Sequence, residues 1–443
     1  MLLVKLRIGR NPIQEHGSTN KGKEAVMRLR MLRIVAFVFL AVQLGGAIAA
    51  DTVKVAFIAP LSGTFALVFE ENLKLFRAAA DEANAKGGVL GGKKIEIVPF
   101  DNKGTPQETL LVLNQAIDQD IRYVLATISS IALTISDALS KYNERNPDKP
   151  VLFLNYDARE PSLTENKCSF WHFRFEPHSD MQVKVLTDHM ASRPSVRKVY
   201  MINQDYAWGH SFKRAAREYL NSTRPDIQFV GDDLVPLGKV KDFAPYVSKI
   251  RASGADTVLT GNWGNDLVLL IKASEQSGLN AEFYTTHSYV WGTPAAIGPS
   301  GADRIKTIMA FHINDANPEW EKKILAYGQK YKPISHMDFL PVWQTMDMFV
   351  QAVNQAQSTD PYKVAVALEG MKYDGPAGES WMRAEDHQLM APIYVTSFVR
   401  KGQPGVKYDT ENTGFGWKTD LLVAAKDNVP PMRCKMERPG QQR

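Results

Sequence analysis

Short apolar segments with a strand pattern alternate with helix patterns along most of this chain. The first strand pattern, over 53–59, is followed by a polar turn at 62–64 and a helix pattern over 65–86. Further strands are predicted at 94–100, 123–128 and 151–155, and then at 198–202, 228–234, 257–260 and 282–285. Because strands separated by helices form parallel sheets with right-handed crossovers, the chain is predicted to be α/β, with doubly wound parallel sheets.

Two lobes are expected from the length of the chain and from a pause in this alternation. The chain has 443 residues, of which 44% are hydrophobic, and a domain holds roughly 100 to 200 residues. The alternation pauses around 173–177 and then resumes, which indicates a second doubly wound lobe. Three later helices, at 319–331, 339–355 and 361–369, are too many for that lobe, so we expect them to return to the first. A last strand is predicted at 394–400, before a tail rich in Gly, Pro and charged residues.

The amino terminus has the pattern of a secretory signal peptide. A basic segment at 27–33 precedes an apolar run over 34–42, and cleavage is expected near Ala49 or Ala50. A membrane-spanning helix would need about 20 apolar residues. The first 50 residues hold eight Lys and Arg against two Glu, a net of +6, whereas the whole chain is +5, so the remainder carries 5 − 6 = −1. We therefore expect an exported protein with no basic surface for nucleic acid.

The chain has two cysteines, Cys168 and Cys434. Disulfides form in oxidising compartments such as the periplasm, so we expect these two residues to be bonded to each other. The alternative is two isolated thiols. A bridge would tie the C-terminal tail to a loop that lies 434 − 168 = 266 positions earlier.

Two segments resemble phosphate-binding or metal-binding motifs and are interpreted as structural. The run 87–94 has the glycines and Lys93 of a phosphate-binding loop, but Lys94 stands where such a loop needs Ser or Thr. This run also leads from a helix to a strand, whereas a phosphate is bound where a helix begins. His172 and His178 lack Cys or acidic neighbours at metal-ligand spacing. No cofactor and no metal ion are therefore expected.

Small polar or aromatic loops follow directly after several predicted strands, and α/β sheets bind ligands at the carboxyl ends of their strands. Considered one at a time, such loops are ordinary helix N-caps. Together they predict a small-molecule site in a cleft between the lobes, with hydroxyls, amides and helix N-termini around the ligand and tryptophans as apolar walls. The candidate ligand-binding residues are Ser62, Ser129, Ser130, Tyr156, Asp157 and Arg159 in the first lobe, and Tyr206, Trp208, Trp263 and His287 in the second.

Two segments carry a resemblance to a known family. Residues 53–63 and 81–96 resemble the type I periplasmic binding proteins, the substrate-binding proteins of branched-chain amino acid ABC transporters. The resemblance covers residues 51 to 400 and implies two lobes joined by a three-crossing hinge, without enzymatic activity. The implied protein is a monomer that captures a small ligand by hinge closure and delivers it to a membrane ABC permease. The implied boundaries are a leader at 1–50, an N-lobe at 51–175 and 311–391, and a C-lobe at 176–310 and 392–443.

The resemblance also assigns roles to individual residues. Ser129 matches the serine that holds the ligand carboxylate, and Trp208 and Trp263 match aromatic contacts of the C-lobe. The acid that usually receives the ligand ammonium falls at His287, and a neutral imidazole does not replace the charge of a carboxylate. Arg159 would instead favour an anionic group.

The ligand is therefore expected to carry a carboxylate, and its class stays open between an amino acid, an aromatic or aliphatic acid, and an amide. Asp157 or Asp205 could supply the missing acid. Two other functions remain as alternatives. One is a periplasmic sensor that reports its ligand to a receptor or regulator, and the other is a hydrolase with Ser129 or Ser62 as nucleophile. The chain has no Gly-x-Ser-x-Gly elbow to support the hydrolase.

Overall fold

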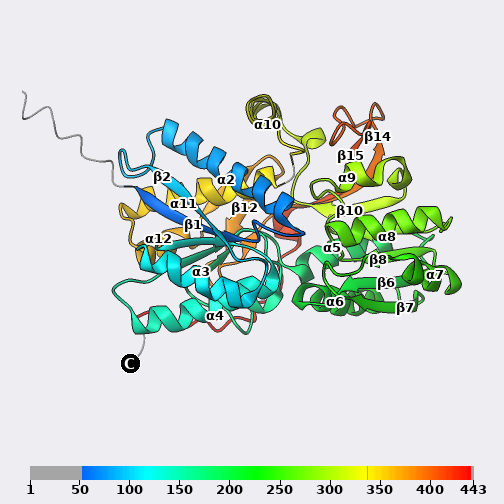
Figure 1. The fold of residues 1–443 in the computed structure, drawn as a ribbon, viewed down its shortest axis with the longest axis horizontal. Helices are drawn as coiled ribbons and strands as arrows, with labels where there is room; N and C mark the ends of the chain where they lie inside the picture. The colour runs from blue at the N-terminus through cyan, green and yellow to red at the C-terminus, as the bar shows by residue number, and fades with distance from the viewer. Residues whose placement is uncertain (1–51, 337, 441–443) are drawn as a thin grey trace, which may run out of the picture. The chain divides into compact units, whose positions relative to one another are not determined.

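The computed structural model describes residues 52–336 and 338–440. The expected signal peptide lies outside this part of the chain. The described residues form two lobes, each built on a sheet that is covered by helices (Figure 1). Among the described helices, none is both long enough and apolar enough to cross a membrane.

The first lobe contains a five-stranded parallel sheet in the order β2-β1-β3-β4-β5. Its strands are β1 (Val53–Ala59), β2 (Ile95–Asp101), β3 (Tyr123–Ala126), β4 (Leu152–Asn155) and β5 (His172–Arg174). Its helices are α2 (Ala66–Ala85), α3 (Pro106–Asp118), α4 (Ser129–Arg145), the short η1 (Pro161–Thr164), α11 (Phe339–Ala356) and α12 (Pro361–Leu368). The late helix α11 packs against α2 and α12, so distant parts of the chain complete this lobe.

A small antiparallel sheet follows α12 in the first lobe. Its strands are β11 (Lys372–Gly375), β12 (Gly378–Met382) and β13 (Leu389–Met390). The Arg174 N–H of β5 donates to the His387 carbonyl beside this sheet, at 2.9 Å. This bond joins the late segment to the edge of the main sheet.

The second lobe contains a seven-stranded sheet in the order β15-β14-β10-β9-β8-β6-β7. Its strands are β6 (Lys198–Gln204), β7 (Gln228–Val235), β8 (Thr257–Thr260), β9 (Glu282–Thr285), β10 (Ile305–Met309), β14 (Ile393–Arg400) and β15 (Phe415–Val423). The predicted parallel arrangement holds from β7 to β10, whereas β14 and β15 add an antiparallel edge that the sequence did not predict.

Several helices accompany the second sheet or link it to the first lobe. They are α5 (Ser179–Ala191), α6 (Ala207–Thr223), α7 (Ala244–Ala252), α8 (Asn265–Gln276), α9 (Thr293–Ile297), η2 (Gly298–Gly301), η3 (Ile313–Asp315), α10 (Pro318–Tyr331) and η4 (Ala425–Asp427). The chain passes between the two sheets after β5, after β10 and after β13. These passages agree with the predicted hinge of three crossings.

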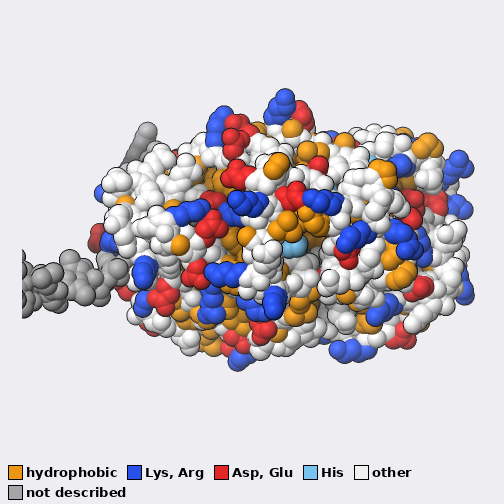
Figure 2. Space-filling view, turned by 90° about the horizontal axis from the view of Figure 1, so that it is seen from above, with side chains coloured by type: hydrophobic (Ala, Val, Ile, Leu, Met, Phe, Trp, Pro, Cys, Tyr) orange, Lys and Arg blue, Asp and Glu red, His pale blue; other side chains and the backbone are white. Residues whose placement is uncertain are grey.

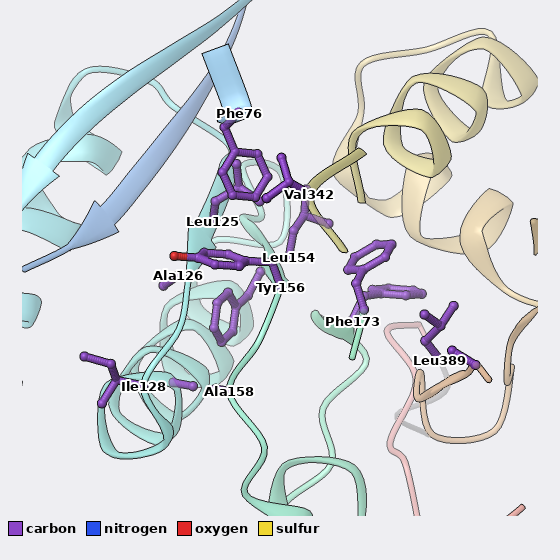
Figure 3. Packing of buried hydrophobic residues seen from close by; sticks show 14 of the residues in the cluster. Phe76, Leu125, Ala126, Ile128, Leu154, Tyr156, Ala158, Phe173, Val342 and Leu389 are labelled. Atoms are coloured by element: carbon purple, nitrogen blue, oxygen red, sulfur yellow. The ribbon is translucent and has the colours of Figure 1, made fainter. Parts of the chain in front are cut away.

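Tyr156 packs into the core of the first lobe, directly behind the end of β4. Its ring lies 4.9 Å from that of Phe76 and 5.9 Å from that of Phe57, and its side chain is fully buried. Figure 3 shows it with Phe76 of α2 and Val342 of α11. This core therefore holds the loop that follows β4 against α2 and α11, two helices that are far apart in the sequence.

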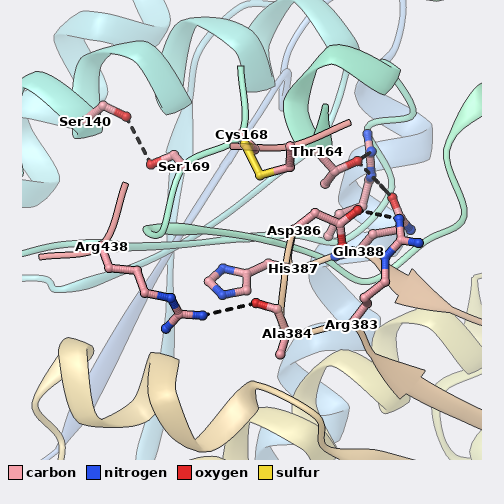
Figure 4. Close-up of a disulfide and its surroundings, with 12 residues drawn as sticks. Ser140, Thr164, Cys168, Ser169, Arg383, Ala384, Asp386, His387, Gln388 and Arg438 are labelled. Carbon is pink, nitrogen blue, oxygen red and sulfur yellow. Dashed lines mark hydrogen bonds and ion pairs between the residues drawn. A yellow bond between two sulfur atoms is a disulfide. The ribbon is translucent and has the colours of Figure 1, made fainter. Parts of the chain in front are cut away.

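Cys168 and Cys434 form a disulfide, as predicted (Figure 4). The chain on either side of Cys434 also contacts the first lobe. Arg433 pairs with Glu165 at 3.5 Å, and Arg438 pairs with Glu369 at 2.7 Å. The sequence-based boundaries assign the whole of 392–443 to the C-lobe, but residues 430–440 contact the first lobe.

We call residues 428–440 the C-terminal strap. At its start, the Asn428 amide donates to the Met181 carbonyl of α5 in the second lobe, at 3.0 Å. The next contact, from Arg383 to the Pro430 carbonyl at 2.8 Å, already belongs to the first lobe. The strap is therefore a fourth connection between the lobes, and Cys434 in its middle bonds it covalently to the first lobe.

Candidate functional site

A cavity lies between the two lobes at the carboxyl ends of their parallel strands. Its volume is about 40 Å³. Residues after β3 and β4 form one side, and residues after β6, β8 and β9 form the other. The lining residues are Val68, Phe69, Asn72, Thr127, Ile128, Ser129, Asp157, Ala158, Arg159 and Asp338 from the first lobe, and Tyr206, Trp208, Trp263, His287 and Val290 from the second.

The structure brings seven of the ten sequence-predicted residues to this cavity: Ser129, Asp157, Arg159, Tyr206, Trp208, Trp263 and His287. The other three lie elsewhere. Ser62 is exposed beyond the end of β1, and Ser130 is half-buried in the first turn of α4. Tyr156 points into the core described above. Asp205, the alternative acid, is exposed and bonds to His210 at 2.8 Å.

Helix α4 begins at the cavity wall. Ile128, directly before it, has a φ of 62°, a backbone conformation that a β-branched residue rarely adopts. This turn places Ser129 at the first position of the helix, and the first turn contains no acidic residue. The N-terminal backbone N–H groups of a helix and its dipole favour an anion, and no side chain of the first turn supplies one.

Arg159 is the buried cation of the site. Its Nε donates to Asp157 at 3.0 Å, its Nη1 to Gln182 at 3.0 Å, and its Nη2 to the Tyr289 hydroxyl at 3.1 Å. Glu176 lies 3.4 Å from the same Nη2. Burial alone would lower the pKa of Arg159, but the neighbouring carboxylates outweigh burial and keep the guanidinium charged. Because Gln182 and Tyr289 belong to the second lobe, Arg159 joins the two lobes.

Three carboxyl groups lie around this single guanidinium: Glu176 and Asp338 are buried, and Asp157 is half-buried. Burial raises the pKa of Glu176 to about 8, against the attraction of Arg159. Burial likewise raises the pKa of Asp157, and Arg159 opposes that rise. Asp338 has its pKa raised by burial and then by repulsion from Asp157. Its Oδ2 has no hydrogen-bond partner within the described part of the chain. The site therefore has more carboxyl groups than protein cations to pair with them.

Aromatic side chains form the wall from the second lobe. Trp263 donates from its indole N–H to the Tyr206 hydroxyl at 2.8 Å, and Trp208 donates to the Gly261 carbonyl at 2.7 Å. The ring of His287 meets Trp208 edge-on at 5.3 Å. Burial, and then the charge of Arg159, lower the pKa of His287 well below its usual value, so its imidazole is neutral. This wall is apolar and uncharged.

The two lobes touch around the cavity. Phe65 of the first lobe lies 4.5 Å from the ring of Trp263, and Ser211 of α6 donates to Glu160 at 2.6 Å. These contacts, together with those of Arg159, describe a closed arrangement of the lobes.

The site also contains residues that were not among the ten candidates, and the polar or aromatic ones include Phe69, Asn72, Tyr289 and Asp338. Phe69 and Asn72 lie inside helix α2, where nothing separates them from core positions. Tyr289 reaches Arg159 across 130 positions in the chain. Asp338 directly precedes α11, where Asp is a common helix cap, yet its side chain caps nothing there. Its φ of 53° was not visible in the sequence.

The chain was compared with known proteins. A family model described as periplasmic binding protein matches residues 52–403. The Leu/Ile/Val-binding protein homolog 4 of Brucella abortus is 31% identical over 434 residues, which covers 94% of this chain and 100% of that protein.

Solved structures give the same picture. The leucine-, isoleucine-, valine-, threonine- and alanine-binding protein of Brucella ovis, in a closed conformation, matches with a TM-score of 0.77 and 27% identity, over 88% of this chain and 100% of that one. A solute-binding protein of an ABC transporter from Rhodopseudomonas palustris BisB5, in complex with 3,4-dihydroxybenzoic acid, matches in fold with a TM-score of 0.73 and 18% identity, over 85% and 99% of the two chains. With its two lobes and the cavity between them, the chain belongs to the periplasmic binding protein family, with the type I fold.

Proposed function

We propose that the protein binds a small carboxylate-bearing ligand in the cavity between its lobes and delivers it to a membrane ABC permease. The observation that carries this proposal is the bonding of Arg159, which reaches from the first lobe to Gln182 and Tyr289 of the second. A ligand drives closure only through contacts that are better made in the closed state. A cavity walled by both lobes supplies such contacts.

The polarity of the cavity supports one orientation of the ligand. Its carboxylate would lie at the start of α4, where Ser129 and the helix N-terminus favour an anion. A ligand ammonium would lie at Asp338, whose Oδ2 is unpaired among the described residues, and near Asp157. The side chain would rest against Trp208 and Trp263. Asp338 would then bind the ligand ammonium, for which the neutral imidazole of His287 is unsuited.

We infer that an aliphatic amino acid is the first candidate ligand, because the unpaired carboxyl oxygen of Asp338 can accept from a ligand ammonium. The names of two Brucella relatives support this class: one is a Leu/Ile/Val-binding protein homolog, and the other is a leucine-, isoleucine-, valine-, threonine- and alanine-binding protein. An aromatic acid is the second candidate. The neutral tryptophan wall favours it, and the Rhodopseudomonas palustris protein of the same fold was solved with 3,4-dihydroxybenzoic acid.

Several further features belong to the same proposal. The ligand would be released unchanged, without catalysis, by a monomer that does not bind nucleic acid. Each lobe would move as a unit, with the boundaries near 175, 310 and 391, and the signal peptide would be cleaved near Ala49 or Ala50. A periplasmic sensor with the same cavity is the alternative. Ligand uptake by cells that requires both this protein and a permease would support transport over sensing.

The test is a binding screen on protein that was unfolded and refolded to remove any carried ligand. Leucine is compared with 4-methylpentanoate, which lacks only the ammonium, and with 3,4-dihydroxybenzoate. A ligand at 100 times its Kd should stabilise the fold by about 2.7 kcal/mol. Tighter binding of leucine supports the amino acid, and tighter binding of the aromatic acid supports the second candidate. Failure of every carboxylate, or turnover of a bound one, would refute the proposal.

A further inference from the structure

Apolar side chains contribute to the boundary between the two lobes. In the space-filling view of the face that carries α10, apolar side chains gather between charged residues near the centre of the molecule (Figure 2). Phe65 of the first lobe belongs to the boundary. Its ring is half-buried and lies 4.5 Å from the ring of Trp263 in the second lobe, at an interplanar angle of 34°. An aromatic pair of this kind adds to stability beyond the area that it buries.

Two glycines of the second lobe lie beside the Phe65 ring. A Cβ on Gly238 would lie 3.1 Å from Phe65 Cζ, and a Cβ on Gly264 would lie 3.6 Å from Phe65 Cε1. The first distance is so short that a side chain at position 238 would push against the ring. Glycine therefore lets the ring approach the backbone closely. We call Gly238, Trp263 and Gly264 the Phe65 slot.

Hydrogen bonds within the second lobe hold the Phe65 slot in place. The Gly238 N–H donates to Asp266 Oδ2 at 2.8 Å. Gln204 Nε2 donates to the same oxygen at 2.7 Å and to the Trp263 carbonyl at 3.2 Å. Both Gln204 and Asp266 are buried. Because these bonds do not involve the first lobe, we expect the slot to keep its shape when the lobes separate.

Phe65 itself is attached firmly to the first lobe. It directly precedes α2, and its carbonyl accepts from the N–H groups of Val68 and Phe69 at 3.1 and 3.4 Å. Helix α2 packs against α11 and β2 of the same lobe. The ring must therefore leave the slot when the lobes open and return to it when they close.

Phe65 contacts a wall of the ligand cavity without lining the cavity. Trp263 lines it from the second lobe, and Val68 and Phe69 line it from the start of α2, whereas Phe65 is not among the lining residues. The contact between Phe65 and Trp263 is thus made without the ligand. A contact that exists only between closed lobes favours closure around any ligand.

We propose that Phe65 is a latch that sets how long a ligand stays bound, an inference that rests on the proposed function. Release requires the lobes to open, and opening withdraws the ring from the Phe65 slot into water, which is unfavourable for an apolar group. This cost arises during opening, so it slows dissociation and leaves the encounter of a ligand with the open lobes unchanged. Phe65 is a positioning residue, since it acts through Trp263.

The experiment measures association and dissociation rates by stopped-flow fluorescence, on mature full-length protein that has been freed of carried ligand. The probe is whichever of leucine and 3,4-dihydroxybenzoate binds more tightly. We expect Phe65→Ala to release the probe roughly 5- to 30-fold faster, from the loss of one half-buried aromatic contact. Association should change less than about 2-fold. A distorted cavity would instead slow association.

Leu110→Ala is the matched control. Leu110 is 41% exposed on α3 of the first lobe and lies outside the cavity. Helix α3 packs against α4, β1 and β2 of its own lobe. This variant also removes a partly exposed apolar side chain, and it should change neither rate.

Gly238→Asn tests the Phe65 slot from the other lobe. Asparagine adopts the φ of 67° at this position more readily than most residues do, but its side chain would push against the Phe65 ring. The variant should speed release about as much as Phe65→Ala does. The double variant should release little faster than either single one, because both changes remove the same contact.

Faster release in both single variants, with effects that do not add in the double variant, supports the latch. An unchanged dissociation rate in Phe65→Ala, association slowed to the same extent, or additive effects would overturn it and leave the proposed function in place. If the unchanged protein binds neither carboxylate, the proposed function fails and the latch fails with it.

Discussion

Replacing Asp338 with asparagine should weaken ligand binding and stabilise the ligand-free fold at the same time. Asp338 is 9% exposed, its Oδ2 is unpaired among the described residues, and burial followed by repulsion from Asp157 raises its pKa. Asparagine keeps the shape of the side chain and removes its charge. The substitution therefore removes both the proposed partner of the ligand ammonium and an unfavourable buried charge.

The magnitudes follow from these contacts. A hydrogen bond to a charged group contributes about 1.5–3 kcal/mol, so Asp338→Asn should raise the Kd for leucine roughly 10- to 150-fold. The Kd for 4-methylpentanoate, which has no ammonium, should change little. At neutral pH an aspartate is ionised in the unfolded chain, and the raised pKa of Asp338 in the folded chain costs free energy that an asparagine does not cost, so the ligand-free variant should unfold a few degrees higher at neutral pH.

The assay is titration calorimetry with both ligands, together with thermal unfolding of the stripped protein. Asp205→Asn is the matched control, because Asp205 follows a strand of the second lobe but is exposed, bonds to His210 and lies outside the cavity. It should change neither quantity. An unchanged leucine Kd in Asp338→Asn, or a lower unfolding midpoint, would refute this reasoning.

Three other predictions concern pH, the interlobe cation and the disulfide. The free energy of unfolding of the ligand-free protein should fall between pH 6.5 and about 8, because Glu176, with a pKa raised to about 8, keeps its proton in the folded state and loses it on unfolding. The buried histidines, with lowered pKa values, act in the opposite sense and below pH 6.5. Thermal unfolding measured across this range gives the slope of stability against pH. This slope should be flatter in Glu176→Gln, and a stability of the unchanged protein that rises between pH 6.5 and 8 would contradict the prediction. Arg159→Ala should weaken ligand binding by more than about 1.5 kcal/mol by calorimetry, and unchanged affinity would exclude its role in joining the lobes. Cys168→Ser combined with Cys434→Ser should lower the free energy of unfolding by about 2–4 kcal/mol in a denaturant titration, whereas equal stability would mean that the ion pairs of the strap suffice.

The sequence predicted most of the parallel strands, because central strands such as β3 and β4 are continuous apolar runs that are buried along their whole length. It did not predict the parallel strands β5 and β10. It also did not predict β15 (Phe415–Val423). In that strand Phe415 and Trp417 are buried, but the polar run 418–420 interrupts the pattern and a Gly-rich loop precedes it. Only pairing with β14 explains why this segment is extended.

The location of the cavity could be predicted because loops after parallel strands converge at one edge of each sheet. The chemistry inside it could not. Asp338 has the sequence context of a helix cap, and its φ of 53° turns it away from that role. Tyr156 directly precedes the site residues Asp157, Ala158 and Arg159 in sequence, yet packs against Phe57 and Phe76. Which side chains of a loop face the ligand depends on backbone angles that residue types do not specify.

The C-terminal strap also decides when the first lobe can be completed during biosynthesis. A chain that is exported from its amino terminus presents Cys168 early, but the partner thiol comes 266 residues later, after the whole second lobe. The second lobe must therefore leave the translocon before the first is covalently closed. Until then Cys168 is a thiol in an oxidising compartment, open to bonding with another chain. Export that stalls before Cys434 would leave a nearly complete protein prone to disulfide-linked dimers.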